Sequence, residues 1–150
     1  MEKILIRDLD EKDIEAVLGI DRKITGSPNP EYWRDKAITY LGRGGGACLA
    51  AEIEGRLVGF VLGDIRGWEF GVPLSGWLEI VGVDPDYQGK GVGRRLVDAL
   101  GQRFLAAGVD TVHTMVDWNA SDLVGYFISM GFKRAEYILM ERKLKGGGTA

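Results

Sequence analysis

The stretch LEIVGVDPDYQGKGVGRRL, from Leu78 to Leu96, decides how the rest of the chain can be interpreted. The apolar run up to Val83 is typical of a buried strand, and Asp84-Pro85-Asp86 is a turn signal that ends it. Glycines then recur at positions 89, 91 and 93, directly before an amphipathic pattern. The stretch therefore predicts a strand, a turn, a glycine-rich loop and a helix, in that order.

The glycine-rich loop is suited to binding an anion. Three close glycines lose much conformational entropy on folding, so we expect them to serve a close approach between the backbone and a ligand. The first N–H groups of a helix have no partner within it, and the helix dipole adds positive charge there. Lys90, Arg94 and Arg95 add formal charge. We predict a phosphate-binding loop; the alternative is a glycine-rich turn without a ligand.

Two common phosphate motifs do not fit this loop. A Walker loop needs Ser or Thr after its lysine to hold magnesium, but Gly91 follows Lys90. A Rossmann fingerprint counted from Gly91 and Gly93 would need a third glycine where Leu96 stands. The strand is also not the first of a βαβ unit, so neither motif is predicted.

The motif that fits is Gln88-x-x-Gly91-x-Gly93, after a strand that ends in Val83-Asp84-Pro85. It resembles the acyl-CoA-binding motif of the GNAT superfamily of N-acetyltransferases. In that family the loop amides hold the pyrophosphate of coenzyme A, and the backbone of the preceding strand pairs with the pantetheine arm. The resemblance implies a set of residues that contact acetyl-CoA: Val81, Gly82, Val83, Gln88, Gly89, Lys90, Gly91, Val92, Gly93, Arg94 and Asn119.

Length and composition indicate the general class of protein. With 150 residues, 45% hydrophobic and 27% charged, the chain matches an ordinary soluble globular protein. We expect residues 1–145 to form a single domain and residues 146–150 a flexible tail. A net charge of −3 argues against nucleic acid as a partner, and no apolar run is long enough to cross a membrane. We expect a cytoplasmic protein, with its one cysteine, Cys48, in the core and no metal site.

Periodicity and turn signals predict ten elements. The first five are a strand at 3–9, a helix capped by Asp10 that loses definition by 21–25, a helix that begins at Pro30 and ends at 42–46, and strands at 47–54 and 56–65. The other five are a strand at 76–83, a helix at 91–107, a strand at 109–116, a helix capped by Asn119 or Ser121, and a last strand at 132–144. The helix at 91–107 has an apolar stripe made of Val92, Leu96, Val97, Leu100 and Phe104. This βααβββ-αβαβ order predicts a strongly twisted mixed α/β sheet flanked by helices. It matches the GNAT acyltransferase fold over almost the whole chain.

Three side-chain patterns refine this picture. The strand at 56–65 is apolar on both faces, which predicts a central strand covered on both sides. The last helix is expected to bury Leu123, Val124, Phe127 and Ile128. The aromatic residues Trp68 and Phe70 lie in a loop, where they could plug the core or line a substrate site.

Acetyl transfer from a thioester to an amine needs a neutral nitrogen. An amine with a pKa of about 10.4 is mostly protonated near neutral pH, so a general base is expected. Glu79 is the candidate base, because a carboxylate among apolar strand residues is costly unless it is used or paired. The alternatives are a glutamate paired with an arginine or one that points to solvent. The only histidine, His113, lies mid-strand and is expected to be a packed neutral imidazole.

The last helix resembles the N-x-x-A…Y-x-x-x-G-F segment of the same family, in which the tyrosine protonates the departing thiolate. Counting seven residues forward from Asn119 gives Tyr126, whereas counting four back from Gly131 gives Phe127. The helical wheel favours Tyr126, because Phe127 lies within the apolar stripe. Asn119 is expected either to contact the coenzyme or to cap the helix.

The sequence thus predicts an acetyl-CoA-dependent N-acetyltransferase that works by direct transfer. A covalent acyl-enzyme is not expected, because Cys48 lies on an early strand far along the chain from the loop. The alternative is a non-catalytic acyl-CoA-binding module. The acceptor stays open among polyamines, aminoglycosides, small amines, peptide N-termini and lysine. We expect a monomer or a small oligomer, and the resemblance adds a homodimer as a candidate, because dimerisation is common in the family.

Overall fold

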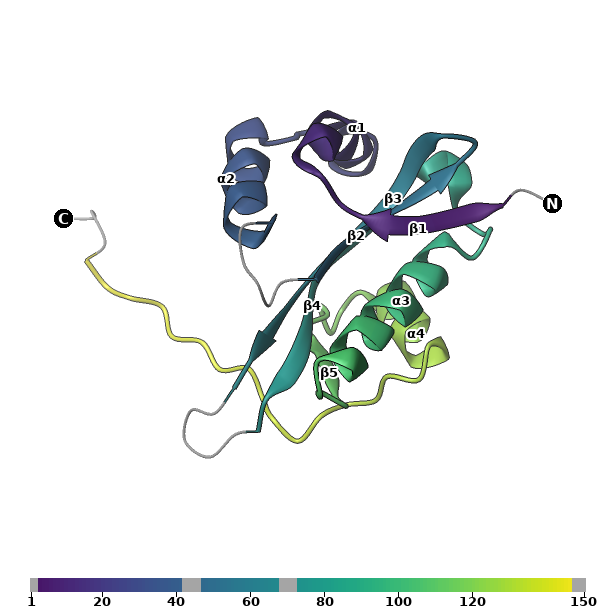
Figure 1. Cartoon of the computed structure of the whole chain (residues 1–150). Helices are drawn as coiled ribbons and strands as arrows, with labels where there is room; N and C mark the ends of the chain where they lie inside the picture. The colour runs from purple at the N-terminus through teal and green to yellow at the C-terminus, as the bar shows by residue number, and fades with distance from the viewer. Residues whose placement is uncertain (1–2, 42–46, 68–72, 147–150) are drawn as a thin grey trace. The chain divides into compact units, whose positions relative to one another are not determined.

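The structure, a computed structural model, describes residues 3–41, 47–67 and 73–146, which divide by their contacts into two compact units, 1–115 and 116–150. The first carries β1 (Ile4–Asp8), η1 (Glu11–Asp13), α1 (Ile14–Thr25), α2 (Pro30–Leu41), β2 (Ala47–Ile53), β3 (Arg56–Arg66), β4 (Ser75–Val83), η3 (Pro85–Tyr87), α3 (Val92–Ala106) and β5 (Val112–Thr114) (Figure 1). The second carries α4 (Ser121–Ser129).

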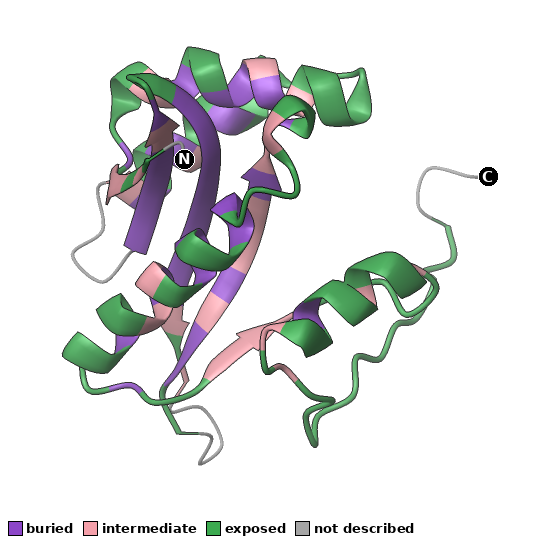
Figure 2. Cartoon of the chain, turned by 90° about the vertical axis from the view of Figure 1, so that its right-hand side faces the viewer, coloured by how far each residue is buried: buried purple, intermediate pink, exposed green. Residues whose placement is uncertain are grey.

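The first unit is built on a five-stranded sheet in the order β1-β2-β3-β4-β5. Neighbouring strands are antiparallel except for β4 and β5, which are parallel. The helices α1 and α2 lie on one face of the sheet and α3 on the other (Figure 1). Residues 57–64 of β3 are all buried, so the predicted central strand and the mixed fold class are confirmed (Figure 2).

The close approach of α3 to the sheet depends on glycines at three strand positions that face it. A Cβ atom at Gly59 would lie 2.8 Å from Val92, and one at Gly76 would lie 2.3 Å from Phe104. A Cβ atom at Gly63, on the same face of the sheet, would lie 2.7 Å from Leu100. Only glycine lets the helix settle this close. The predicted apolar stripe of α3 is buried throughout: Val92, Leu96, Val97, Leu100 and Phe104.

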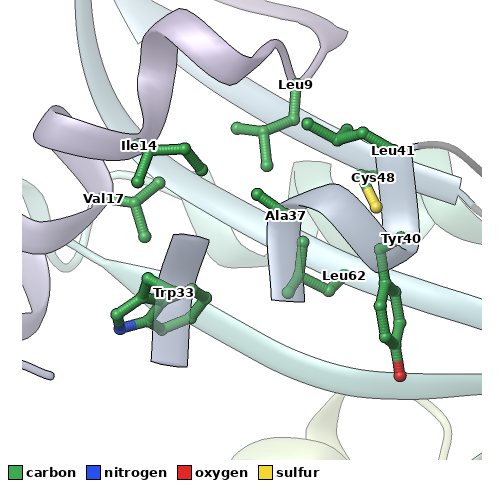
Figure 3. Close-up of a pocket in the computed structure, with 9 residues that line it drawn as sticks. All are labelled: Leu9, Ile14, Val17, Trp33, Ala37, Tyr40, Leu41, Cys48 and Leu62. Atoms are coloured by element: carbon green, nitrogen blue, oxygen red, sulfur yellow. The ribbon is translucent and has the colours of Figure 1, made fainter. Parts of the chain in front are cut away.

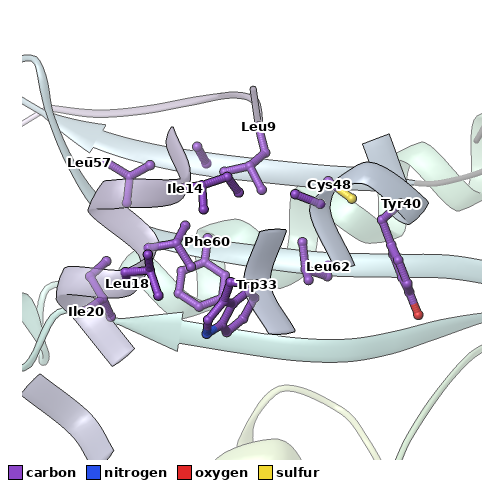
Figure 4. Close-up of a cluster of buried hydrophobic side chains, with 13 residues drawn as sticks. Leu9, Ile14, Leu18, Ile20, Trp33, Tyr40, Cys48, Leu57, Phe60 and Leu62 are labelled. Carbon is purple, nitrogen blue, oxygen red and sulfur yellow. The ribbon is translucent and has the colours of Figure 1, made fainter. Parts of the chain in front are cut away.

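The opposite face packs around Trp33 of α2. Its indole ring meets the ring of Phe60 on β3 edge to face, with 5.4 Å between the centroids (Figure 4). Its indole N–H donates to the carboxylate of Asp21 on α1, at 2.9 Å. Trp33 therefore joins both helices to the sheet, and its polar atom is satisfied within the core.

The first helix continues beyond the point where its pattern fades. The prediction that it loses definition over residues 21–25 is wrong, because polar residues there are compatible with an exposed helical turn. The helix ends instead at Gly26, which has a φ of +76° and donates its N–H to the carbonyl of Arg22 at 2.9 Å. A glycine in the left-handed region is a common helix stop.

Two strands differ from their predicted lengths. The strand predicted at 109–116 pairs with β4 only over Val112–Thr114, because the ladder ends at Leu78, where β4 changes its register. The last strand predicted at 132–144 is not formed in the structure, which has no strand among its described residues after Thr114. Its apolar run at 137–140 is exposed. Apolar content alone does not make a strand, since a strand also needs a partner for its backbone groups.

The second unit has a small core of its own around Phe127. The Phe127 ring packs edge to face on Phe132 at 5.3 Å between centroids, and of the four apolar residues predicted to be buried in this helix only Phe127 is. The predicted cap is wrong: the N-cap residue is Ala120, which has no side chain for capping. The backbone N–H of Asn119 donates instead to the Asp117 carboxylate at 2.9 Å, in a turn before the helix.

Some predictions fall on residues that the structure does not describe. They concern the loop aromatics Trp68 and Phe70, the end of the second helix at 42–46, and the tail except for Gly146.

The glycine contact with α3 leads to a stability prediction. Gly76→Ala should destabilise the protein by about 1–3 kcal/mol, because the new methyl group overlaps the Phe104 ring. Gly101→Ala is the matched control within α3, where a Cβ meets no atom within 4 Å. It should stabilise by roughly 0.5–1 kcal/mol through helix propensity. Urea denaturation of both variants measures these changes, and equal effects would contradict the proposed role of the glycine.

Candidate active site

The exit from β4 is fixed by Asp84. Its backbone N–H donates to the carbonyl of Val58 on β3, at 2.8 Å. Its carboxylate accepts from the N–H of Asp86 at 2.9 Å, and its carbonyl accepts from the N–H of Tyr87 at 2.8 Å. The first bond holds Asp84 on β3, and the other two form the η3 turn, so together they determine the direction in which the chain leaves the sheet.

The glycine-rich loop leads from η3 into the N-terminus of α3. Gly89 and Gly91 have φ values of +80° and +84°, in the left-handed region that favours glycine. Gly91 is the N-cap of α3, and its carbonyl accepts the first helical bond from Arg95 at 3.0 Å. The N–H groups of residues 92–94 therefore have no acceptor within the helix. The predicted glycine-rich loop and the helix after it are confirmed. Free amides at a helix N-terminus are groups that can bind an anion.

Charge and space around this loop suit an anionic ligand. Lys90 and Arg94 are both exposed beside the helix terminus. A Cβ atom at Gly89 or Gly91 would meet no atom within 4 Å, so the loop backbone is open on that side. The side-chain amide of Gln88 donates across the turn to the Val83 carbonyl, at 3.5 Å.

One edge of β4 is available for pairing beside the loop. The ladder with β5 ends at Leu78, whose carbonyl accepts from the Thr114 hydroxyl at 3.0 Å. Beyond this point, no strand of the described residues pairs with residues 79–83 on that side. An extended ligand can therefore form backbone hydrogen bonds along Val81, Gly82 and Val83.

Glu79 lies at the point where β4 and β5 diverge. On β3, Leu62 pairs with Ile80 and Gly63 pairs with Leu78, so Glu79 is an extra residue in β4. Such a β-bulge redirects a side chain and is frequent next to active sites. The Glu79 carboxylate forms an ion pair with Arg66 of β3. This is one of the alternatives that the sequence left open for Glu79, and the pair leaves its role as a base untested.

An aromatic and polar cluster lies next to this pair on the sheet. The Arg66 guanidinium lies over the Trp77 ring, 5.4 Å from its centroid, and the Trp77 and His113 centroids are 5.2 Å apart. His113 Nδ1 is 3.0 Å from the hydroxyl of the buried Ser75. His113 is thus packed mid-strand as predicted. Arg66, Trp77 and Ser75 were not predicted as site residues, because pairing across β3, β4 and β5 brings them together from distant parts of the sequence.

A pocket between α1, α2, β2 and β3 is lined mainly by apolar side chains and by no residue of the glycine-rich loop. Figure 3 shows its lining: Leu9, Ile14, Val17, Trp33, Ala37, Tyr40, Leu41, Cys48 and Leu62. Burial raises the pKa of the Cys48 thiol to about 11. The thiol therefore stays protonated near neutral pH and is a poor nucleophile, as expected of a core cysteine.

The remaining predicted site residues belong to the second unit. Tyr126 is 37% exposed on α4, whereas Phe127 is buried, and their ring centroids are 5.7 Å apart. Asn119 is exposed before the helix. Over the described part of the chain, no group of three His, Cys, Asp or Glu side chains could hold a metal ion, and no helix could span a membrane.

Comparison with known proteins identifies the family. A model described as the acetyltransferase (GNAT) family matches residues 14–132. The chain belongs to the GNAT family. An acetyltransferase of Pectobacterium atrosepticum is 27% identical over 96 residues, which cover 64% of this chain and 64% of that protein. The predicted family is thereby confirmed.

Solved structures show the same GNAT fold. An aminoglycoside N-acetyltransferase in complex with CoA superposes with a TM-score of 0.82 at 18% identity, covering 95% of this chain and 96% of the other. A ribosomal-protein-alanine N-acetyltransferase from Brucella melitensis superposes with a TM-score of 0.74 at 18% identity, covering 95% and 100%. These two GNAT proteins are named for very different acceptors, so the fold does not identify the acceptor.

Proposed function

We propose that this GNAT protein transfers an acetyl group from acetyl-CoA directly to an amine. The observation that carries the proposal is the glycine-rich loop at the N-terminus of α3, placed directly after the bulged and half-paired β4. The relative named as a complex with CoA supports the choice of cosubstrate. The proposal places the protein in the cytoplasm, as a monomer or a homodimer.

In this proposal the coenzyme lies along β4 and ends at the loop. The pyrophosphate accepts hydrogen bonds from the amides of residues 89–94, and Lys90 and Arg94 balance its charge. The pantetheine arm pairs with the open edge at Val81–Val83. Gln88 orders the loop through its bond to Val83, and Asn119 is proposed as a further contact.

The reaction needs one base and one acid. The amine nitrogen attacks the thioester carbonyl, forming a C–N bond, and the C–S bond breaks as the tetrahedral intermediate collapses. Glu79 accepts the proton that the amine loses, directly or through a water, and Tyr126 donates a proton to the departing thiolate. Because Glu79 forms an ion pair with Arg66, the guanidinium must release the carboxylate, or a water must relay the proton, before Glu79 can act as the base.

The ion pair at Glu79 also favours a second candidate, a non-catalytic acyl-CoA-binding module. A carboxylate already held by a guanidinium could be structural rather than catalytic. Both candidates bind coenzyme A, so turnover separates them. The test is release of free thiol from acetyl-CoA in the presence of polyamines, aminoglycosides, small amines, peptide N-termini and lysine. The enzyme should accelerate thiol release with at least one of these amines, whereas the binding module should with none.

The loop assignment is tested by Gly91→Asp. An added carboxylate at the N-terminus of α3 should abolish coenzyme A binding in calorimetry, because it opposes the pyrophosphate charge. Gly108→Asp is a matched control at the other end of the helix, with a φ of +83° and open space around its Cβ. It should keep wild-type affinity. Unchanged binding by Gly91→Asp would refute the phosphate-loop assignment.

The base is tested by Glu79→Gln. This change removes the proton acceptor, so turnover should fall by about 10²–10⁴-fold while coenzyme A affinity stays within a few-fold. Glu52→Gln is the control, because Glu52 is also a strand carboxylate paired with an arginine of a neighbouring strand, Arg7. It should keep full turnover. A pH–rate profile of Glu79→Gln that matches the wild type would assign Glu79 a structural role.

The acid is tested by comparing Tyr126 with its neighbour. Tyr126→Phe should lower turnover by about tenfold with little loss of stability; the effect is modest because a thiol with a pKa of about 8.5 leaves readily. Phe127→Ala should instead cost about 3–5 kcal/mol, because it empties the core of the second unit. Turnover and urea denaturation are measured for both. Full turnover in Tyr126→Phe would mean that the thiolate leaves without this acid.

A further inference from the structure

One lysine of α1 holds two carboxylates of the turn that precedes the glycine-rich loop. Lys23 Nζ lies 2.9 Å from Oδ2 and 3.1 Å from Oδ1 of Asp84, and 3.0 Å from Oδ2 of Asp86. The two aspartates flank Pro85, the first residue of η3. Lys23 is in the last turn of α1, 61 residues before Asp84. A helix on one face of the sheet is thus tied to the start of the loop.

Asp84 needs this partner because its side chain is only 4% exposed. A buried carboxylate is costly unless it is paired and hydrogen-bonded. Burial by itself would raise the pKa of Asp84, but the Asp86 amide and the Lys23 ammonium outweigh it and hold the pKa below its usual value. The hydrogen bond with Asp84 and then that with Asp86 raise the pKa of Lys23. Lys23 and Asp84 are therefore both charged near neutral pH.

We propose that Lys23 is a positioning residue for the coenzyme loop. Its bonds to Asp84 and Asp86 orient the η3 turn, and through it the loop amides and the N-terminus of α3. It also offsets negative charge that would otherwise stand beside the bound pyrophosphate. This inference rests on the proposed function, because it requires that the loop binds coenzyme A.

The two carboxylates that Lys23 holds differ in exposure, so the loss of each bond has a different effect. The Lys23 side chain is 38% exposed and that of Asp86 is 73% exposed, so water screens this pair and it contributes little to the free energy of unfolding. The Asp84 side chain is buried, so losing Lys23 also lowers stability. A loss of stability alone leaves the affinity of the folded protein for coenzyme A unchanged, whereas loss of a positioning role lowers that affinity, because the loop must present several amides at once.

Lys23→Met tests the inference, with Lys12→Met as the control. Lys12 is an exposed lysine of η1 in the same unit, so both variants lose one positive charge. Calorimetry measures the Kd for coenzyme A, and initial rates give KM for acetyl-CoA and kcat. Lys23→Met should raise Kd and KM about tenfold with kcat within twofold, whereas Lys12→Met should change neither. Lys23→Arg should restore most of the affinity, because a guanidinium can bridge the same two carboxylates.

The outcomes separate failure of the inference from failure of the proposed function. If the wild-type protein does not bind coenzyme A, the proposed function fails, and the inference with it. If the wild type binds and Lys23→Met binds equally well, only the inference is overturned. A tenfold loss shared by Lys12→Met would reflect overall charge and overturn it too. A fall in kcat with unchanged KM would place Lys23 in the chemical step, against the inference.

Discussion

The contact between α3 and the glycines of β3 and β4 is the constraint on which the candidate site depends. Gly59, Gly63 and Gly76 leave room for the buried stripe of α3, and a side chain at any of them would push the helix outward. Because the helix is held there, its N-terminus lies directly beyond the end of β4. The free amides of the helix and the open edge of the strand are thereby arranged for one extended ligand with an anionic end.

The β-bulge at Glu79 places a carboxylate where the two parallel strands separate, but its ion pair with Arg66 serves two opposite roles. The pair lowers the cost of holding a carboxylate at a half-buried position. The same pair must loosen, or relay through water, for Glu79 to accept a proton. The Arg66 guanidinium also lies over the Trp77 ring while it pairs with Glu79, and this cation–π contact helps to hold it beside β4.

Local signals in the sequence were sufficient for the loop and most of the first unit. Residue type explains the positive φ values at Gly89 and Gly91, and the helical period of apolar residues explains the buried stripe of α3. Both are properties of residues that are close together in the sequence. The partner of Glu79 and the bonds of Lys23 could not be predicted in this way, because they depend on how distant segments pack. The prediction of a last strand at 132–144 was wrong for a related reason. An apolar run shows that a segment is suited to a strand, but it does not show that a partner strand is present.

The central claim is that backbone amides of the glycine-rich loop bind the pyrophosphate of coenzyme A. Titration of the ¹⁵N-labelled protein with coenzyme A, followed by amide chemical shifts, tests it most directly. The claim predicts the largest shifts at Gly89, Gly91 and the first residues of α3, with little change at Gly108. Saturable shifts that leave the loop amides unmoved and cluster elsewhere would contradict it.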